Sequence, residues 1–370
     1  MSIQVIKKCK AKLLKLVTNV KRNSFNRENI KSIIIFRYDR IGDMVISLPL
    51  CKALNQGLPQ TNITMIASAA NACIAETCQY VDKTVIKPQR WIRWLKVLIE
   101  LRTKKYDLAI DLNHAVTPHT IFAIRLIRPR HVASPFKDGR WGVKGVDIRL
   151  FDLMPPQHPL KYARPIAETY LDIARLLNCS TDECIPYPLP NWTKSENIPD
   201  NYVILNLSGS RASMKLQEAD VSAIIQQIRR LDSSLRILIP AMQKDHERLK
   251  TLYKGIPMVD VLAPSASIVP ILSLIQFSKL VITPDTALVH IACAYGVPLV
   301  AVYTGDKALF AQWQPYPSSK AAVIHSNTSK GLAGYSLADL LSSIVDALNP
   351  LSYENAYVDT RLNNQYSKST

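Results

Sequence analysis

The residues with the clearest capacity for chemistry form a short segment that follows an apolar run. The segment reads Thr283-Pro284-Asp285-Thr286-Ala287-Leu288-Val289-His290. Asp285 and Thr286 are expected at the N-terminus of a helix, where backbone N–H groups and side chains can bind an anion or sugar hydroxyls. His290 follows one turn later on the same face. A single histidine in such a helix is more often a core residue, but its register with Asp285 and Thr286 favours a binding site.

A loop rich in small hydroxyl residues follows an earlier apolar run at 203–206. It reads Ser208-Gly209-Ser210-Arg211-Ala212-Ser213-Met214-Lys215. Backbone N–H groups at a glycine turn, together with the positive charge of Arg211 or Lys215, suit a phosphate. The spacing differs from the G-x-x-x-x-G-K-[ST] pattern of P-loop proteins. The alternative interpretation is a solvated segment that caps the next helix.

A third motif, Arg37-Tyr38-Asp39-Arg40-Ile41-Gly42-Asp43, stands where the first predicted strand turns into a helix. Asp43 is expected beside the carboxyl end of this strand, where open parallel sheets bind ligands. The alternative is structural, because aspartate is a favoured N-cap residue and complements the helix dipole. A dinucleotide-binding site is not indicated, since the pattern G-x-G-x-x-G does not occur in the sequence.

The elements that would position these motifs alternate between short β-branched runs and helical patterns, as in doubly wound α/β domains. In the first half, strands are predicted at 33–36, 63–67, 84–86, 108–111 and 131–133, and helices at 44–56, 70–77, 91–104, 119–127 and 163–177. Residues 134–158 have weak periodicity and predict an irregular basic loop with Lys137, Arg140, Lys144 and Arg149. Loops of this kind commonly contact substrates.

The second half repeats the alternation after a proline-rich stretch at 181–199, which predicts a linker because proline disfavours helix and strand pairing. Strands are then predicted at 203–206, 236–239, 280–283 and 299–302, and helices at 217–231, 244–254, 268–276 and 287–294. We therefore expect two doubly wound domains, at 31–180 and 201–350, that face a central cleft and are joined by a linker at 181–200. A leader at 1–30 and a tail at 351–370 complete the expected organisation.

The composition agrees with a two-domain globular protein. The 370 residues exceed what one hydrophobic core usually holds, and 48% hydrophobic with 20% charged residues argues against intrinsic disorder. The seven cysteines are scattered, with no C-x-x-C pair and no histidine at ligand spacing. This favours a reducing compartment and argues against structural zinc.

The net charge of +17 comes entirely from the first 150 residues, which hold 27 Lys and Arg against 10 Asp and Glu. This asymmetry predicts an anionic partner for the first half: nucleic acid, an acidic membrane surface or a phosphorylated substrate.

Residues 3–22 form a basic amphipathic stretch, which we expect to lie on a membrane without crossing it; a solvated leader is the alternative. The basic and aromatic cluster at 90–105 also suits a membrane interface. Nucleic acid is not expected, because no zinc finger, RNA-recognition motif or basic zipper is present.

Taken together, the motifs resemble those of glycosyltransferase family 9, the lipopolysaccharide heptosyltransferases. The similarity rests on Arg40-Ile41-Gly42-Asp43 with Leu48-Pro49, the strand at 107–111, the segment 208–215, and Asp285-Thr286-x-x-x-His290 with Gly296-Val297-Pro298, in this order across residues 32–325. The resemblance implies an α/β fold of the GT-B type, built from two Rossmann-like domains. It also implies that the N-terminal half binds mainly the acceptor and the C-terminal half an ADP-activated heptose.

The reaction implied by this resemblance is an inverting, metal-independent single displacement that needs no cofactor. Asp43 would be the catalytic base and would take the proton from the attacking acceptor hydroxyl, while Lys215 would act beside it on the leaving diphosphate. The expected donor-binding residues are Ser208, Gly209, Ser210, Asp285, Thr286, Ala287 and His290, and the expected acceptor-binding residues are Arg40, Arg140 and Lys144. The family usually has glycine after Asp-Thr, where this chain has Ala287.

The resulting expectation is a cytoplasmic glycosyltransferase, peripheral on the inner face of the bacterial inner membrane. It would transfer a heptose from ADP-heptose to an anionic lipid-linked saccharide in lipopolysaccharide biosynthesis. The alternatives are a GT-B transferase that uses another nucleotide sugar, or a non-catalytic membrane-associated protein that binds sugar nucleotides. Asp43 and Lys215 argue against the non-catalytic alternative.

Overall fold

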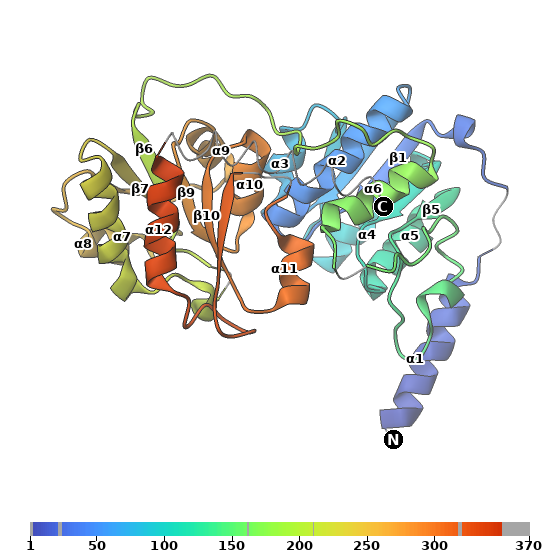
Figure 1. Ribbon diagram of the computed structural model, residues 1–370. Helices are drawn as coiled ribbons and strands as arrows, with labels where there is room; N and C mark the ends of the chain where they lie inside the picture. The colour runs from blue at the N-terminus through green and yellow to red at the C-terminus, as the bar shows by residue number, and fades with distance from the viewer. Residues whose placement is uncertain (1–2, 21–23, 161–162, 210, 317–319, 350–370) are drawn as a thin grey trace, which may run out of the picture. The chain divides into compact units, whose positions relative to one another are not determined.

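The computed structural model describes residues 3–20, 24–160, 163–209, 211–316 and 320–349. Ser210 and the predicted tail at 351–370 therefore lie outside the described residues. The chain forms two compact units, one up to Pro190 and one from Asn191 onward. Within each unit a parallel sheet carries helices on both faces (Figure 1). The predicted pair of doubly wound α/β sheets is thus confirmed.

Unit 1 contains a five-stranded parallel sheet in the order β3-β2-β1-β4-β5. Its strands are β1 (Ser32–Phe36), β2 (Asn62–Ala67), β3 (Lys83–Ile86), β4 (Leu108–Asp111) and β5 (His131–Ala133). Its α-helices are α1 (Ile3–Thr18), α2 (Ile41–Gly57), α3 (Ala72–Glu76), α4 (Trp91–Thr103), α5 (Pro118–Ile127) and α6 (Ile166–Leu176). The central strand β1 is an unbroken apolar run that is completely buried from Ile33 to Phe36, as expected for a parallel strand covered on both faces.

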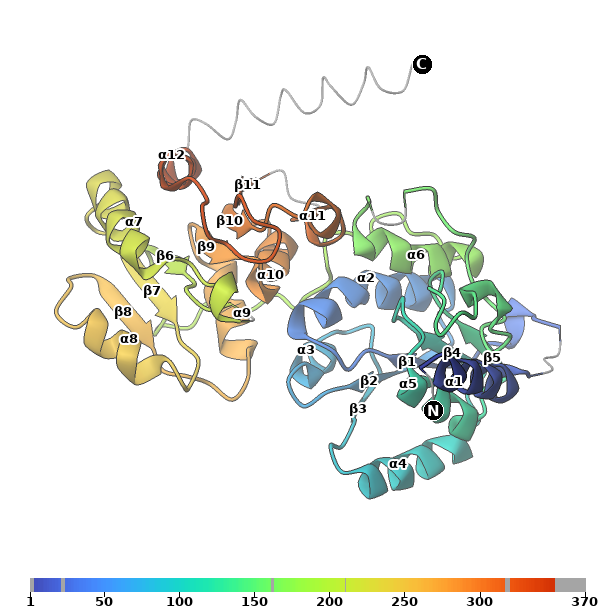
Figure 2. The ribbon, with the colours of Figure 1, turned by 90° about the horizontal axis from the view of Figure 1, so that it is seen from below.

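The helices of unit 1 lie in two layers. Helices α2 and α6 lie on one side of the sheet, and α4 and α5 lie on the other (Figure 2). Leu14 of α1 joins the hydrophobic cluster of α4 and α5, so α1 packs on the same face of the sheet. Leu14 and Thr18 are buried, whereas most other side chains of α1 are exposed, so this leader is a helix that packs on unit 1 along one side only. Its contact with a membrane stays a prediction.

Unit 2 contains a six-stranded parallel sheet in the order β11-β10-β9-β6-β7-β8. Its strands are β6 (Tyr202–Leu205), β7 (Arg236–Pro240), β8 (Val259–Leu262), β9 (Val281–Pro284), β10 (Leu299–Tyr303) and β11 (Ala321–His325). Its α-helices are α7 (Glu218–Leu231), α8 (His246–Leu252), α9 (Val269–Gln276), α10 (Ala287–Tyr295), α11 (Lys307–Trp313) and α12 (Leu337–Leu348). Helices α7 and α12 pack on each other, as do α9 and α10.

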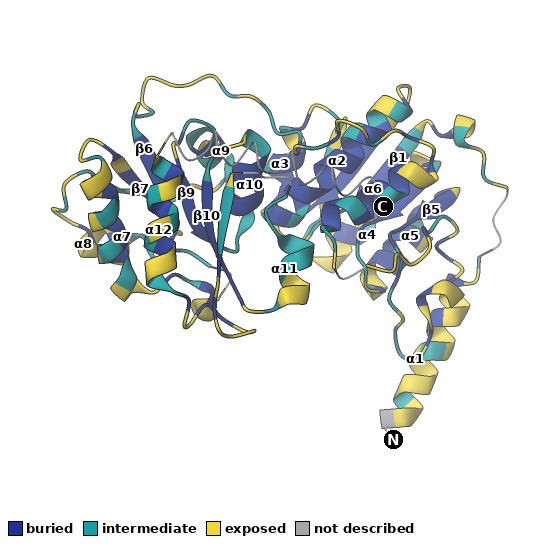
Figure 3. Cartoon of the chain, viewed as in Figure 1, coloured by how far each residue is buried: buried dark blue, intermediate teal, exposed yellow. Residues whose placement is uncertain are grey.

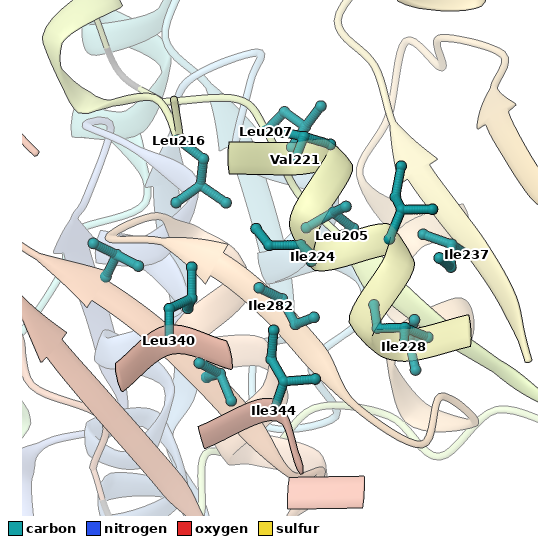
Figure 4. Close-up of a cluster of buried hydrophobic side chains, with 14 of the residues drawn as sticks. Leu205, Leu207, Leu216, Val221, Ile224, Ile228, Ile237, Ile282, Leu340 and Ile344 are labelled. Carbon is teal, nitrogen blue, oxygen red and sulfur yellow. The ribbon is translucent and has the colours of Figure 1, made fainter. Parts of the chain in front are cut away.

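The core of unit 2 lies between its sheet and the pair α7 and α12. Figure 4 shows side chains of α7 and α12 directed toward the sheet residues Leu205, Ile237 and Ile282. Burying one such isoleucine or leucine side chain contributes about 1.5–3 kcal/mol. The central strands of both sheets are dark blue in Figure 3, whereas the edge strands β3, β8 and β11 are only partly buried and the outer faces of the covering helices are exposed. The loops at the carboxyl ends of the strands are therefore carried by a rigid frame.

Four elements of unit 2 are not predicted by the sequence: the edge strands β8 and β11, and the helices α11 and α12. Both strands are largely half-buried; Asp260 interrupts the apolar run of β8, and β11 begins with two alanines, which are weak strand formers. Helix α12 begins after Ser336, whose side chain accepts a hydrogen bond from Asp339 N at 3.2 Å. This cap could have been found in the sequence.

The segment between the units, residues 178–201, is described throughout and contains neither helix nor strand. Its second part is tied to unit 2: Trp192 N donates to Gln276 Oε1 at 2.8 Å, and Trp192 Nε1 donates to Tyr295 Oη at 2.9 Å. Burial raises the pKa of Tyr295 to about 12. The tyrosine therefore stays protonated and neutral while it accepts this bond.

Candidate active site

In unit 1, Asp43 lies in the first turn of α2, at the carboxyl end of β1. Helix α2 begins at Ile41 with Arg40 as its N-cap, so Asp43 is the third helical residue. Its Oδ2 accepts the backbone N–H of Arg40 at 3.1 Å. The structural alternative of Asp43 as the N-cap residue is therefore wrong in position: the carboxylate caps from the third residue, because the helix starts three residues before the predicted Met44.

A buried arginine binds Asp43 from the core side. Arg37 Nη2 donates to Asp43 Oδ1 at 2.7 Å, and Nη1 donates to Asp39 Oδ2 at 3.2 Å. The guanidinium carbon lies 5.2 Å from the centre of the Tyr170 ring. Burial acts to lower the pKa of Arg37, but Tyr170 and the carboxylates of Asp43 and Asp39 outweigh it, and the pKa is raised. Arg37 thus remains a cation that holds both carboxylates.

Both carboxylates remain accessible to a ligand. The Asp43 side chain is 13% exposed, and each of its oxygens accepts one hydrogen bond, so lone pairs remain for a further donor. The Asp39 side chain is 40% exposed. Burial, followed by the charges of Asp43 and Asp111, raises the pKa of Asp39 despite the opposing effect of Arg37. Either carboxylate can therefore contact a ligand hydroxyl, and Asp43 is the less exposed of the two.

The turn that carries these residues is organised by Asn71, which is completely buried. Its Nδ2 donates to the carbonyls of Arg37 at 3.2 Å and Arg40 at 3.3 Å, and its Oδ1 accepts the N–H of Ser68 at 2.8 Å. Sequence reasoning missed both Arg37 and Asn71. Arg37 follows the apolar run of β1 directly, and this position was the available signal.

The expected acceptor-binding residues occupy two places in unit 1. Arg40 is exposed at the start of α2. Arg140 is partly buried, donates to the carbonyl of Val116 at 2.6 Å and lies 4.7 Å from the Trp141 ring, whereas Lys144 is exposed. Their role in acceptor binding stays a prediction.

Lys137 lies in the irregular loop that the sequence predicts, but its charge is not available for a substrate contact. Its side chain is completely buried, and Nζ donates to Asp111 Oδ2 at 2.8 Å. Nζ also lies 4.7 Å from the centre of the Phe151 ring. A buried lysine and aspartate pair of this kind ties the loop to the end of β4, and removing one partner would leave an uncompensated charge.

A hollow of about 120 Å³ lies where β3 ends and α4 and α5 begin; its lining residues are Lys87, Pro88, Gln89, Trp91, Trp94 and His119. Lys87 Nζ lies 5.2 Å from the centre of the Tyr38 ring. Trp91 is 53% exposed, but Trp94 is 2% exposed and belongs to the core. The cluster at 90–105, which we expect to suit a membrane interface, therefore presents Trp91 but not Trp94 at the surface.

In unit 2, the loop after β6 folds back on itself at Gly209. A Cβ at this position would come within 1.9 Å of the carbonyl oxygen of Met214, so only glycine fits without rearrangement. Lys215 stands at the end of this loop, and its side chain is partly exposed. Its Nζ donates to Asp245 Oδ2 at 3.1 Å. Asp245 is the N-cap residue of α8. Asp245 thus holds the ammonium group of Lys215 beside the loop.

Asp285, Thr286 and Ala287 lie at the carboxyl end of β9 and the start of α10. Thr286 is the N-cap, and its Oγ1 accepts the N–H of Leu288 at 3.3 Å. Because β6 and β9 are neighbours in the parallel sheet, their following loops share one edge. The structure thus brings Ser208, Gly209 and Lys215 to the same edge of unit 2 as Asp285 and Thr286.

His290 is 3% exposed and belongs to the buried side of α10. Its ring centre lies 6.3 Å from that of Trp313. Burial lowers the pKa of His290 to about 4, so the imidazole is neutral at pH 7. It can therefore orient a neighbour as a neutral group but supplies no charge to a diphosphate. Its role in donor binding stays a prediction.

Within the described ranges, no group of three or more His, Cys, Asp or Glu side chains is arranged to hold a metal ion.

Comparison with known protein families shows to which family this chain belongs. The model of glycosyltransferase family 9 (heptosyltransferase) matches residues 148–333, which is half of the chain. The chain belongs to glycosyltransferase family 9. The matched span includes both segments at the edge of unit 2, and the protein is a glycosyltransferase. No curated protein matches the sequence.

Solved structures similar to this glycosyltransferase confirm the GT-B type of fold. A family 9 glycosyl transferase from Veillonella parvula DSM 2008 is 16% identical, with a TM-score of 0.70 over 87% of this chain and 98% of that one. E. coli ADP-heptose lps heptosyltransferase II is 20% identical, with a TM-score of 0.67 over 86% and 98%. E. coli heptosyltransferase WaaC with ADP is 19% identical, with a TM-score of 0.64 over 85% and 99%.

Proposed function

We propose that this glycosyltransferase moves a heptose from ADP-heptose to a hydroxyl of an anionic lipid-linked acceptor, with inversion and without a metal ion, in lipopolysaccharide core assembly. The observation that carries the proposal is the family match, because it includes the segments at the edge of unit 2 that suit a diphosphate. Similar structures are named as an ADP-heptose heptosyltransferase and as a heptosyltransferase with ADP. Unit 2 would bind the donor and unit 1 the acceptor.

The donor diphosphate would lie against Ser208, Gly209 and the first turn of α10. Backbone N–H groups of a glycine turn and of a helix start are donors for an anion, and Lys215 adds a full positive charge. Negative charge grows on the diphosphate as the bond to the sugar breaks. Fixed donors at this place therefore stabilise the transition state more than the ground state, which is the role a metal ion has in other transferases.

The acceptor hydroxyl would be activated by Asp43. A carboxylate oxygen takes the hydroxyl proton while the acceptor oxygen forms its bond to the anomeric carbon. The bond between that carbon and the diphosphate oxygen breaks with its electrons on the diphosphate, and attack from the opposite side inverts the configuration. Arg37 supports this role, because it holds Asp43 Oδ1 at 2.7 Å and keeps the carboxylate in one orientation.

The donor proposal predicts selective use of ADP-heptose that chelation does not affect. Lipid-linked acceptor would be prepared from a strain that lacks this enzyme. Purified enzyme would then be mixed with the acceptor and, in separate reactions, with ADP-heptose, ADP-glucose, UDP-glucose or UDP-N-acetylglucosamine. Mass spectrometry should find one added heptose with ADP-heptose alone, equally with and without EDTA. Transfer from another nucleotide sugar would favour the alternative GT-B transferase. Activity lost on chelation and restored by magnesium would contradict the metal-independent mechanism.

Attachment to the inner face of the inner membrane would use α1, which has two different faces. Leu14 and Thr18 pack on unit 1, whereas Leu13 and Leu16 on another side are 61% and 75% exposed. Exposed lysines, among them Lys10 and Lys12, flank this apolar side. A helix with apolar residues between lysines suits the surface of an anionic bilayer. In the described part of the chain, no helix combines the length and apolar character needed to span a bilayer.

Replacing the outward leucines should weaken membrane binding without affecting the site. The double variant Leu13→Gln with Leu16→Gln is expected to bind vesicles of anionic phospholipid about 100-fold more weakly or worse, because each leucine buried in the bilayer contributes about 1.5–3 kcal/mol. Vesicle co-sedimentation at several salt concentrations measures this effect, and turnover on a soluble lipid-free acceptor should not change. The matched control is Leu231→Gln with Leu252→Gln, two exposed leucines of unit 2. Equal binding by all three proteins would exclude α1 as the anchor.

A further inference from the structure

We infer that Asn206 is a positioning residue for donor binding, which holds the loop after β6 and the start of α10 in one fixed arrangement. The inference rests on the proposed donor site in unit 2. Asn206 directly follows β6, its side chain is almost completely buried, and its backbone N–H donates to the carbonyl of Ile282 on β9 at 2.8 Å.

The topology places Asn206 where two loops separate. Strand β6 pairs with β9, but the chain continues from β6 to β7 on one side and from β9 to β10 on the other. Adjacent parallel strands with diverging connections open a crevice at their carboxyl ends, and ligands of such sheets bind there. Asn206 is at this point of divergence, between the segment with Ser208 and the segment with Thr286.

One amide side chain bonds to both segments. Its Oδ1 accepts the backbone N–H of Ser208 at 3.0 Å, and its Nδ2 lies 3.3 Å from the carbonyl oxygen of Ser208. On the other side, Nδ2 lies 2.9 Å from Thr283 Oγ1 and 3.3 Å from Thr286 Oγ1. The bonds to the two threonines connect residues 77 and 80 positions apart in the chain.

The hydroxyl hydrogens of the two threonines are also determined by this network. Thr283 Oγ1 donates to the carbonyl of Pro284 at 2.9 Å, so it accepts from Asn206. Thr286 Oγ1, 3.0 Å from Thr283 Oγ1, must then donate to it, while accepting from the N–H of Leu288. Both hydroxyl hydrogens are therefore used inside the protein. At the start of α10, the donors that remain for a diphosphate are therefore backbone N–H groups, whose positions depend on the segments that Asn206 connects.

Such an arrangement is formed before the donor binds, so binding does not require the two segments to be ordered against each other. A neutral amide is also suited to this place, since it donates toward one segment and accepts from the other without adding charge. Aspartate has the same shape, but it lacks the Nδ2 donors and would add a negative charge near the proposed diphosphate.

The test measures the affinity for ADP by isothermal titration calorimetry on the full-length protein. Asn206→Asp should weaken ADP binding by about 10- to 100-fold, the range expected when hydrogen bonds beside a charged ligand are lost. Asn206→Ala should weaken it about tenfold. In turnover assays, the KM for ADP-heptose should rise more than kcat falls, because the residue acts on donor binding and not on the acceptor.

A matched control lies at the other end of the same strand. Asn201 precedes β6, and its Nδ2 donates to Asp232 Oδ2 at 3.1 Å and to Ser234 Oγ at 2.7 Å. Asn201→Ala should leave ADP affinity at the wild-type level, even if thermal unfolding occurs at a lower temperature. An equal loss of ADP affinity in Asn201→Ala and Asn206→Ala would mean that the asparagines only stabilise unit 2, and would overturn the inference.

A second variant covers the case in which replacements of Asn206 fail to fold. Thr283→Val keeps the shape of a completely buried side chain but removes the oxygen that accepts from Asn206. It should weaken ADP binding severalfold, and unchanged affinity would contradict the inference. If wild-type protein binds ADP and the variants at 206 and 283 bind it equally well, the inference alone is wrong. If wild-type protein does not bind ADP, the proposed donor is wrong and the inference is overturned with it.

Discussion

Asp43→Asn is expected to lower turnover by about two to four orders of magnitude, because asparagine cannot accept the proton of the acceptor hydroxyl. Asparagine has nearly the same shape, and its side-chain oxygen can still accept one of the bonds from Arg37 or the Arg40 N–H. Loss of the remaining cap bond would cost about 1 kcal/mol. Affinity for ADP should therefore stay close to wild type, while kcat falls.

The neighbouring carboxylate supplies the control for this variant. Asp39 also bonds to Arg37, at 3.2 Å, and its side chain is more exposed than that of Asp43. Asp39→Asn should reduce kcat far less than Asp43→Asn if Asp43 is the base. The reverse order of the two effects would assign proton transfer to Asp39. Wild-type turnover in both variants would show that neither Asp39 nor Asp43 is the catalytic base.

Lys215→Met is expected to reduce kcat/KM for the donor by about 100- to 1000-fold, since a positive charge beside the leaving diphosphate is lost in a site where charge develops. Methionine retains most of the aliphatic chain, so packing changes little. The effect should divide between weaker ADP binding and a lower kcat, because the diphosphate is anionic before transfer and more so during it. Steady-state kinetics and ADP titration measure the two parts.

The variant Asp245→Asn tests the charge of Lys215 apart from the ion pair that Lys215 forms with Asp245. Asp245 accepts from Lys215 Nζ at 3.1 Å, and both side chains are partly exposed, so the pair contributes little to stability. If Lys215 acts on the diphosphate, freeing it from Asp245 should change kcat/KM much less than removing it. Equal losses in Lys215→Met and Asp245→Asn would show that the ion pair itself, and not the charge on the donor, is what the enzyme needs.

Much of the architecture follows from local patterns in the sequence. The predicted strand at 33–36 coincides with the buried part of β1, and the predicted helices at 268–276 and 287–294 differ from α9 and α10 by one residue. Apolar runs bounded by turn residues are strong signals, because parallel strands covered on both faces need continuous apolar side chains. The signal is weaker in β8, where Asp260 interrupts the apolar run, and in β11, which begins with two alanines.

The candidate site likewise combines residues that local sequence predicts with contacts that only the tertiary structure shows. The sequence by itself determined that Asp43, Ser208, Lys215 and Thr286 follow strands of two doubly wound sheets, because strand periodicity and loop chemistry are local properties. Only the tertiary structure decided that Arg37 holds Asp43 and Asp39, that Lys137 is buried on Asp111, and that Asn206 connects Ser208 with Thr283 and Thr286. Several of these contacts join residues far apart in the chain, such as Asn206 and Thr283 at a separation of 77 positions. No spacing rule encodes such a contact, because strand order and register bring the partners together and they depend on the packing of the whole sheet.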